Sequence, residues 1–155
     1  MYKNILVPHA GTPAGDVALE HAIHIAKASS AKIMILHVVE EAQYPPSFAL
    51  SESERRELFK SIREYNEEIR HKMEIQIEKL SKKSSTKGIK TDIKVVIGSA
   101  ADEILKLVNN KVDLIVMAKR RKLKGVKKLL SLGSVSRKIV ENVTCPILLI
   151  DIEKS

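Results

Sequence analysis

Short runs of hydrophobic residues recur along the chain at intervals that leave room for a helix between them. Five such runs span residues 4–8, 32–39, 91–98, 112–118 and 146–152, and all but 91–98 are nearly continuous. Continuous apolar runs of this length are typical of parallel strands, because helices cover both faces of a parallel sheet. The pattern therefore predicts five buried strands.

The segments between these runs carry helix signals. Thr12 can cap a helix that has Pro13 at its first position, and Ser99 precedes acidic residues that favour another helix start. Apolar residues recur at helical spacing after both positions. A further helix is predicted over residues 134–142, so helices and strands alternate from end to end.

The longest helical segment follows a loop over residues 42–50. Ser51 and Glu54 form a capping box at its start, and the helix is predicted to reach Ser84. Its apolar positions step by three or four: Leu58, Ile62, Tyr65, Ile69, Met73, Ile77 and Leu80. We expect this stripe to belong to the core, with a surface for a partner helix as the alternative.

This alternation predicts a single α/β domain over residues 1–155, with a parallel Rossmann-like or flavodoxin-like sheet and helices on both faces. Ligands of such sheets bind beyond the carboxyl ends of the strands, where the strand order switches. The candidate site is therefore built from "PHAGT" after the first strand, "HVV" at the end of the second, and "MAKRR" after the fourth. A Gly-Ser turn before the last helix completes it.

The charge of the chain is concentrated at this edge. The formal net charge is +8, and seven of the ten residues 119–128 are Lys or Arg. A local patch of this kind attracts anions, although such a run can also be a solvated surface. Nucleic acid is a rival ligand, but residues 117–139 contain no aromatic side chain on which a base could stack, so we do not expect nucleic acid as the partner.

Composition indicates the cellular compartment and whether a disulfide or metal site is expected. The single cysteine, Cys145, excludes an internal disulfide and is expected to be a packed, inert thiol in a reducing compartment. No run reaches the length of a membrane span, and the amino terminus lacks the apolar stretch of a signal peptide, so we expect a cytoplasmic protein. His21 and His24 share a helix face, but without further ligands nearby we predict no metal site.

The chain resembles the universal stress protein family in the segments "NILVPHAGTPAGDVALEHAIHIAKASSAKIMILHVVE", "DLIVMAKRR" and "LLSLGSVSRKIVENVTCPILLI", and in their order. The resemblance implies a five-stranded sheet of order 3-2-1-4-5. It also implies a homodimer formed through the last strand, residues 147–152. Some members of this family bind ATP, and others do not.

Nucleotide-binding members carry Gly-x-x-Gly, nine residues and then Gly-Ser or Gly-Thr after the fourth strand. Gly133 and Ser134 match the second half, but an ungapped alignment places Arg120 and Leu123 at the earlier glycines. If the alignment is anchored at the strand end, Ala118 takes the first glycine's place and the loop is two residues longer. The family's Asp in "P-x-D" after the first strand is replaced here by Ala10.

The resemblance implies a set of site residues in three groups. The base and ribose would be lined by Pro8, Val38, Met117 and Ala118, and Ala10 is a further site residue in the segment after the first strand. The phosphates would be held by Gly133, Ser134, Val135 and Ser136, with Lys119, Arg120 and Arg121 as auxiliary cations. His9 either hydrogen-bonds a ribose or base edge or packs in the core.

The sequence contains none of the common hydrolase, Walker or zinc-protease motifs, so we do not expect an enzyme. The prediction is a non-catalytic stress-response module that binds an adenine nucleotide (ATP, ADP or AMP) or another anion through a degenerate motif. The alternative is a dimeric interaction or structural stress protein that has lost nucleotide binding and uses its long helix as the working surface.

Overall fold

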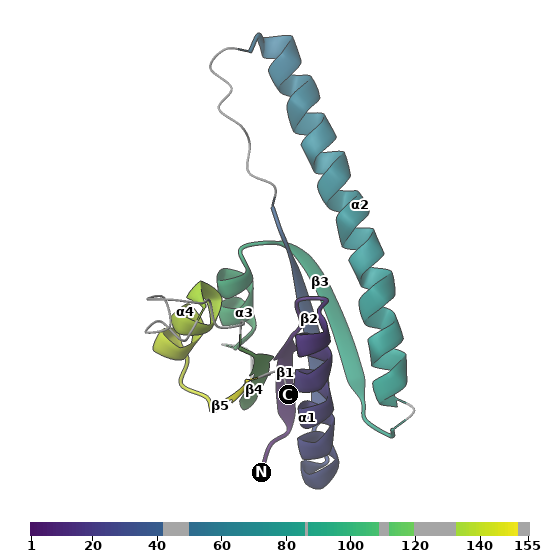
Figure 1. Ribbon diagram of the computed structural model, residues 1–155, viewed down its shortest axis with the longest axis vertical. Coiled ribbons are helices and arrows are strands. Elements are labelled where there is room, and N and C mark those ends of the chain that lie inside the picture. Colours follow the sequence, from purple (N-terminus) through teal and green to yellow (C-terminus); the bar gives the residue numbers. More distant parts are fainter. Residues whose placement is uncertain (42–49, 86, 109–111, 120–132, 152–155) are drawn as a thin grey trace.

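The computed structural model describes residues 1–41, 50–85, 87–108, 112–119 and 133–151. Within these ranges the chain forms one parallel sheet of five strands, in the order β3-β2-β1-β4-β5, with four helices around it (Figure 1). The predicted fold class and strand order are therefore confirmed. The strands are β1 (Asn4–Pro8), β2 (Lys32–Glu40), β3 (Thr91–Gly98), β4 (Leu114–Ala118) and β5 (Ile147–Ile150). The helices are α1 (Pro13–Ser29), α2 (Glu52–Ser85), α3 (Ala100–Val108) and α4 (Ser134–Asn142).

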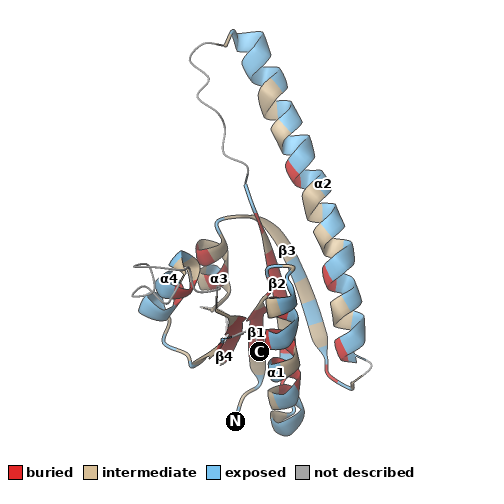
Figure 2. Cartoon of the chain, viewed as in Figure 1, coloured by how far each residue is buried: buried red, intermediate tan, exposed pale blue. Residues whose placement is uncertain are grey.

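Each face of the sheet is covered by two helices. Side chains on β1 alternate between the faces: Ile5 and Val7 pack in the core beneath α1 and α2, whereas Leu6 packs beneath α3 and α4. The buried strand residues in Figure 2 lie between these two helical layers. This alternation decides which face each residue at the strand ends can reach.

The predicted helix starts have the expected caps. The Thr12 hydroxyl accepts the N–H of Gly15 at 3.4 Å at the start of α1. At the start of α2 the Ser51 N–H donates to Glu54 Oε2 at 2.8 Å, and the Glu54 N–H donates back to the Ser51 hydroxyl at 3.4 Å. The capping box therefore forms as the sequence indicates.

Strand β4 begins two residues later than predicted, at Leu114. The reason is the side chain of Asp113, whose carboxylate accepts the N–H groups of Lys3 at 2.8 Å and Asn4 at 3.1 Å. This carboxylate takes up N–H donors at the start of β1, where the sheet ladder begins. β5 ends at Ile150 in the described part of the chain, and residue 152 of the predicted strand lies outside it.

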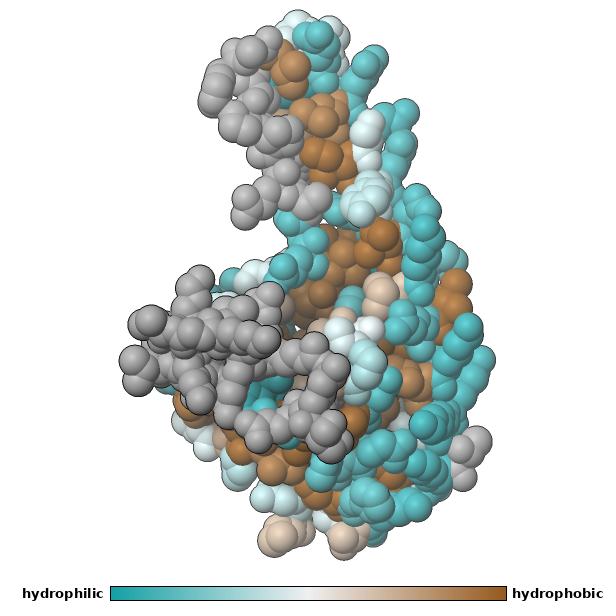
Figure 3. Space-filling model, in the orientation of Figure 1, coloured by the Kyte–Doolittle hydropathy of each residue, from teal (hydrophilic) through white to brown (hydrophobic). Residues whose placement is uncertain are grey.

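The apolar stripe of α2 is buried over only part of its length, so the expectation that it belongs to the core is wrong for its amino-terminal half. Ile77 is completely buried, whereas Tyr65 is 58% exposed. A helix of 34 residues is about 51 Å long, and the eight residues of β3 span only about 26 Å. The helix therefore extends past the sheet, as Figure 1 shows, and Figure 3 shows apolar side chains along the extended part.

No helix in the described part of the chain is both long enough and apolar enough to cross a membrane.

Candidate functional site

The carboxyl ends of β1, β2 and β4 bring together part of the predicted site. Val38 and Met117 pack in one apolar cluster with Val135 of α4, on the face covered by α3 and α4. Pro8 ends β1 at a position that faces the same side as Leu6. Ala118 packs instead with the cluster under α1 and α2, so it is one residue too far along β4 to share this face.

The amino terminus of α4 has the geometry expected of an anion-binding turn. Gly133 is the N-cap residue, with φ −66° and ψ 162°, and it provides no side-chain cap. The first N–H groups of a helix have no partner within the helix, and no described residue accepts those of Ser134, Val135 and Ser136. Ser136 is buried and Val135 is half-buried, so this turn begins against the cluster that holds Val38 and Met117.

Lys119 is the part of the basic segment 119–128 that the structure describes. Its ammonium lies 3.0 Å from Oδ2 of Asp151, and its N–H donates to the carbonyl of Ile150 at 2.8 Å. The side chain is only 16% exposed. Lys119 therefore links the ends of β4 and β5 through its ion pair with Asp151 and its backbone hydrogen bond to Ile150. Arg120 and Arg121, the other predicted auxiliary cations, lie outside the described residues.

His9 lies on the opposite face of the sheet, beneath α1. Its residue is 3% exposed, its Nδ1 accepts the N–H of Gly11 at 3.0 Å, and its Nε2 donates to Asp16 Oδ1 at 3.1 Å. Burial lowers the pKa of His9 below its ordinary value, although Asp16 acts in the other direction. The structure therefore packs His9 against α1. Ala10 follows it in the exposed turn.

A recess that the sequence did not predict lies where the end of β2 faces α2. We call it the α2 recess; its volume is about 320 Å³. It is lined by Ala10 and Gly11 of the β1–α1 turn, by residues 37–40 of β2, and by Tyr65, Asn66, Ile69 and Met73 of α2. The position of Asn66 could have indicated this recess, because it is a polar residue at helical spacing within the apolar stripe, four positions after Ile62 and three before Ile69.

Gly11 shapes one wall of the α2 recess. Its φ is +72°, a left-handed conformation that favours glycine, and a Cβ there would lie 2.7 Å from Cε of Met73. The turn after β1 therefore approaches α2 more closely than a residue with a side chain would allow.

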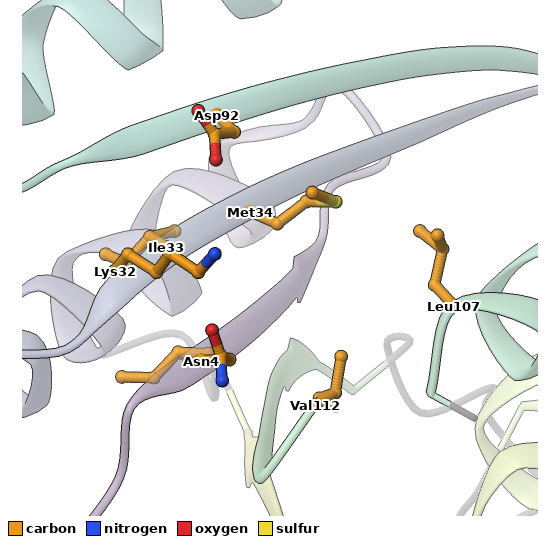
Figure 4. A pocket seen from close by; sticks show the side chains of 8 residues that line it. Asn4, Lys32, Ile33, Met34, Asp92, Leu107 and Val112 are labelled. Carbon is orange, nitrogen blue, oxygen red and sulfur yellow. The ribbon is translucent and has the colours of Figure 1, made fainter. Parts of the chain in front are cut away.

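A second cavity, of about 130 Å³, lies at the other edge of the sheet, near the amino ends of β1 and β2. Figure 4 shows Asn4, Lys32 and Asp92 on the strand side of this cavity, with Leu107 of α3 and Val112 opposite. None of the predicted site residues lines it. Among the described residues, no group of three or more His, Cys, Asp or Glu side chains could hold a metal ion, and His21 and His24 gain no further ligand.

Comparison with known proteins gives consistent results. A model of the universal stress protein family matches residues 1–151. The chain is 31% identical to the universal stress protein YxiE of Bacillus subtilis (strain 168), over 97% of this chain and 99% of YxiE. It is similar to the solved structure of protein MJ0577 of Methanocaldococcus jannaschii, with a TM-score of 0.79, 24% identity, and coverage of 100% and 99% of the two chains. It is also similar to a universal stress protein in complex with cAMP, with a TM-score of 0.59, 20% identity, and coverage of 96% and 97%.

Proposed function

This chain belongs to the universal stress protein family, and on that premise we propose that it is a non-catalytic stress-response module that binds an adenine nucleotide, ATP, ADP or AMP, or another anion. The binding site is the carboxyl edge of the sheet. The observation that carries the proposal is that Val38, Met117 and Val135 belong to one apolar cluster, and that this cluster includes a residue of the first turn of α4, where no described residue accepts the first N–H groups.

In this arrangement the two ends of a nucleotide meet different chemistry. Pro8, Val38 and Met117 offer an apolar surface to the base and ribose, and the turn from Gly133 to Ser136 offers N–H donors to the phosphates. A related protein of the same fold has been solved with cAMP, which supports an adenine ligand. Arg120 and Arg121 would add positive charge.

Two features of this chain affect how it would hold a nucleotide. Ala10 provides no carboxylate after β1, and Lys119 already pairs with Asp151. We therefore assign most of the phosphate contact to the start of α4 and treat Lys119 as a cation that must exchange partners to reach a ligand.

Isothermal titration with ATP, ADP and AMP tests the proposal. Ser136→Ala is expected to weaken ATP binding about tenfold, since hydrogen bonds to charged groups contribute about 1.5–3 kcal/mol. Ser61→Ala is the matched control, because this hydroxyl is exposed on α2 and bonds the Glu57 carbonyl at 3.0 Å. Absence of heat with all three nucleotides and with inorganic phosphate, up to millimolar concentration, would overturn the proposal.

The second candidate is a dimeric interaction protein without nucleotide binding. The half of α2 that extends past the sheet favours it, because that half presents half-buried or exposed apolar side chains such as Ile62 and Tyr65. This function would be identified if the protein bound another protein through α2 but gave no heat in titrations with ATP, ADP, AMP or phosphate.

We further propose that the chain is a homodimer formed through residues 147–152. β5 is an edge strand of the sheet, and its residues Ile147, Leu148 and Leu149 are half-buried apolar side chains. An apolar edge of this kind invites pairing with another strand. Sedimentation at micromolar concentration should show a dimer, and a monomer would contradict the assignment. Burial raises the pKa of the Cys145 thiol, which supports an unreactive cysteine. The proposed cytoplasmic location is supported by the presence of a single cysteine, which suits a reducing compartment.

A further inference from the structure

The cavity near the amino ends of β1 and β2, which we call the amino-edge cavity, has a polar wall and an aliphatic wall. Asn4, Lys32 and Asp92 come from β1, β2 and β3, and their polar ends point into the same space in Figure 4. Leu107 and Val112 lie across from them. A cavity with a few convergent polar groups and an apolar wall suits a small molecule that has a charged end and an aliphatic end.

The register of the sheet brings these side chains to one face. Asn4 is level with Lys32, and Met34 is level with Asp92 on the neighbouring strand. Alternate residues of a strand point to the same side, so Lys32 shares its face with Met34, which packs in the cluster under α3 and α4. The Cα atoms of Lys32 and Asp92 are then about 8 Å apart, along a diagonal of the sheet. The two charges therefore reach the cavity from different strands.

The polar side chains of the amino-edge cavity make no hydrogen bond or ion pair with any described residue. The backbone N–H of Asn4 bonds Asp113 and that of Lys32 bonds the Lys3 carbonyl, but the side-chain amide and ammonium make no such contact within the described ranges. The same holds for the Asp92 carboxylate, so Lys32 and Asp92 carry opposite charges without pairing. Both residues are exposed, and a ligand can reach them from solvent.

This charge pattern favours a ligand that carries both signs close together. An anion attracted by Lys32 would also meet the Asp92 carboxylate, and a cation attracted by Asp92 would also meet the Lys32 ammonium. A zwitterion satisfies both, because its carboxylate can accept from Lys32 while its ammonium donates to Asp92 and to the amide oxygen of Asn4. In an α-amino acid these two charged groups are attached to the same carbon atom.

The aliphatic wall and the volume limit the rest of the ligand. Met34, Leu107 and Val112 are half-buried, and none of the described residues that line the cavity is aromatic. The volume is about 130 Å³, slightly below the roughly 150 Å³ of a cavity that holds benzene. The cavity therefore has room for a short branched side chain and too little for an aromatic amino acid.

We propose that the amino-edge cavity is a second ligand site, which binds a free α-amino acid with a short branched aliphatic side chain, such as valine. Lys32 holds the carboxylate, Asp92 and Asn4 hold the ammonium, and the aliphatic wall encloses the side chain. The five residues of β1 separate this site from the proposed nucleotide site by about 15 Å. The two ligands can therefore be bound together, and the proposal does not depend on nucleotide binding.

Isothermal titration with valine and two fragments of it tests the need for both charges. The compound 3-methylbutanoate is valine without its ammonium, and 2-methylpropan-1-amine is valine without its carboxylate. Each fragment loses hydrogen bonds to a charged group, so valine is expected to bind about tenfold or more tightly than either. Phenylalanine is expected to give no heat. Equal affinities of valine and its two fragments would overturn the recognition of a zwitterion.

Charge-removing variants place the ligand in the cavity. Asp92→Asn should weaken valine binding about tenfold and leave the binding of 3-methylbutanoate unchanged or tighter, whereas Lys32→Met should weaken the binding of both. Glu78→Gln and Lys90→Met are the matched controls, because they remove the same charges from exposed residues that do not line the cavity, and both should keep the affinity for valine. Valine binding that neither Asp92→Asn nor Lys32→Met alters would overturn the site.

Titration of valine in the presence of saturating ATP separates this site from the proposed nucleotide site. The affinity for valine should be unchanged, because the two sites lie at opposite edges of the sheet. Competition between the two ligands would place valine elsewhere and overturn the proposal. Absence of heat with valine up to about 10 mM would also overturn it, and neither result bears on whether ATP itself binds.

Discussion

The Lys119 ammonium lies 3.0 Å from the Asp151 carboxylate, so the described cation of the basic segment is held at the end of β5 by a partner of opposite charge. Asp151 and an incoming phosphate therefore compete for the same lysine. We expect Asp151→Asn to strengthen ATP binding by about two- to fivefold at low salt, the range expected when a surface ion pair is removed.

The matched control for that change is Asp92→Asn, which removes the same charge from an exposed residue at the opposite edge of the sheet. Titrations at low and high salt should show that the gain for Asp151→Asn shrinks as salt rises. Equal affinities of the two variants would show that Lys119 takes no part in binding.

The burial of His9 makes the stability of the fold depend on pH. Burial lowers the pKa of His9 below its ordinary value of 6.5, so the unfolded state binds a proton more readily than the folded state. The free energy of unfolding should therefore be highest above pH 6.5 and decrease as the pH falls below that value and through the folded pKa. Urea unfolding between pH 7.5 and about pH 5 measures this slope.

His9→Gln should flatten this part of the curve, whatever its effect on stability at neutral pH. The carboxylates with lowered pKa, such as Glu20 and Asp102, start from ordinary values of 4.5 and 3.8 and so act at lower pH. A slope that is unchanged in His9→Gln would assign it to another group.

The contact between α1 and His9 predicts an unusual sign for a glycine substitution. A Cβ on Gly15 would lie 2.8 Å from Nε2 of His9, which is buried and hydrogen-bonded to Asp16. Gly15→Ala should therefore destabilise the protein by about 1–3 kcal/mol, although alanine usually stabilises a helix. Chemical denaturation measures the change.

A double-mutant cycle identifies the cause. In a His9→Ala background the ring is absent, and Gly15→Ala should become neutral or stabilising. The same destabilisation in both backgrounds would mean that the His9 ring is not the obstacle.

The partial burial of α2 predicts different effects for two isoleucines that are two residues apart. Ile77 is completely buried, and Ile75 is 45% exposed. Ile77→Ala should lower the free energy of unfolding by about 2–5 kcal/mol. Ile75→Ala is the matched control and should change it by about 0.5 kcal/mol or less. Similar losses at both positions would contradict the packing of α2.

The architecture could be predicted because most strands are nearly continuous apolar runs and the helices have recognisable starts. The strand order came from the family resemblance, since the runs alone do not say which strands are neighbours. The start of β4 was missed by two residues because Asp113 hydrogen-bonds the backbone of Lys3 and Asn4, and such a long-range contact leaves no local signal. The length of exposed α2 was missed because an amphipathic stripe does not reveal how far the sheet beneath it extends.

Part of the site could be predicted because its residues follow from the order of the strands. Val38, Met117 and Val135 gather because strand ends of a parallel sheet share one edge. The placement of His9 could have been read from its parity with Ile5 and Val7, which directs it to the α1 face. Asn66 and His37 were not identified because they line one recess from segments that are distant in sequence.

β2 continues past the last residue of β1 and forms a ledge, whose length depends on the lengths of the two strands and not on loop conformation. Side chains on this ledge lie outside the packed layers, so substitutions there can change ligand preference while the fold is kept.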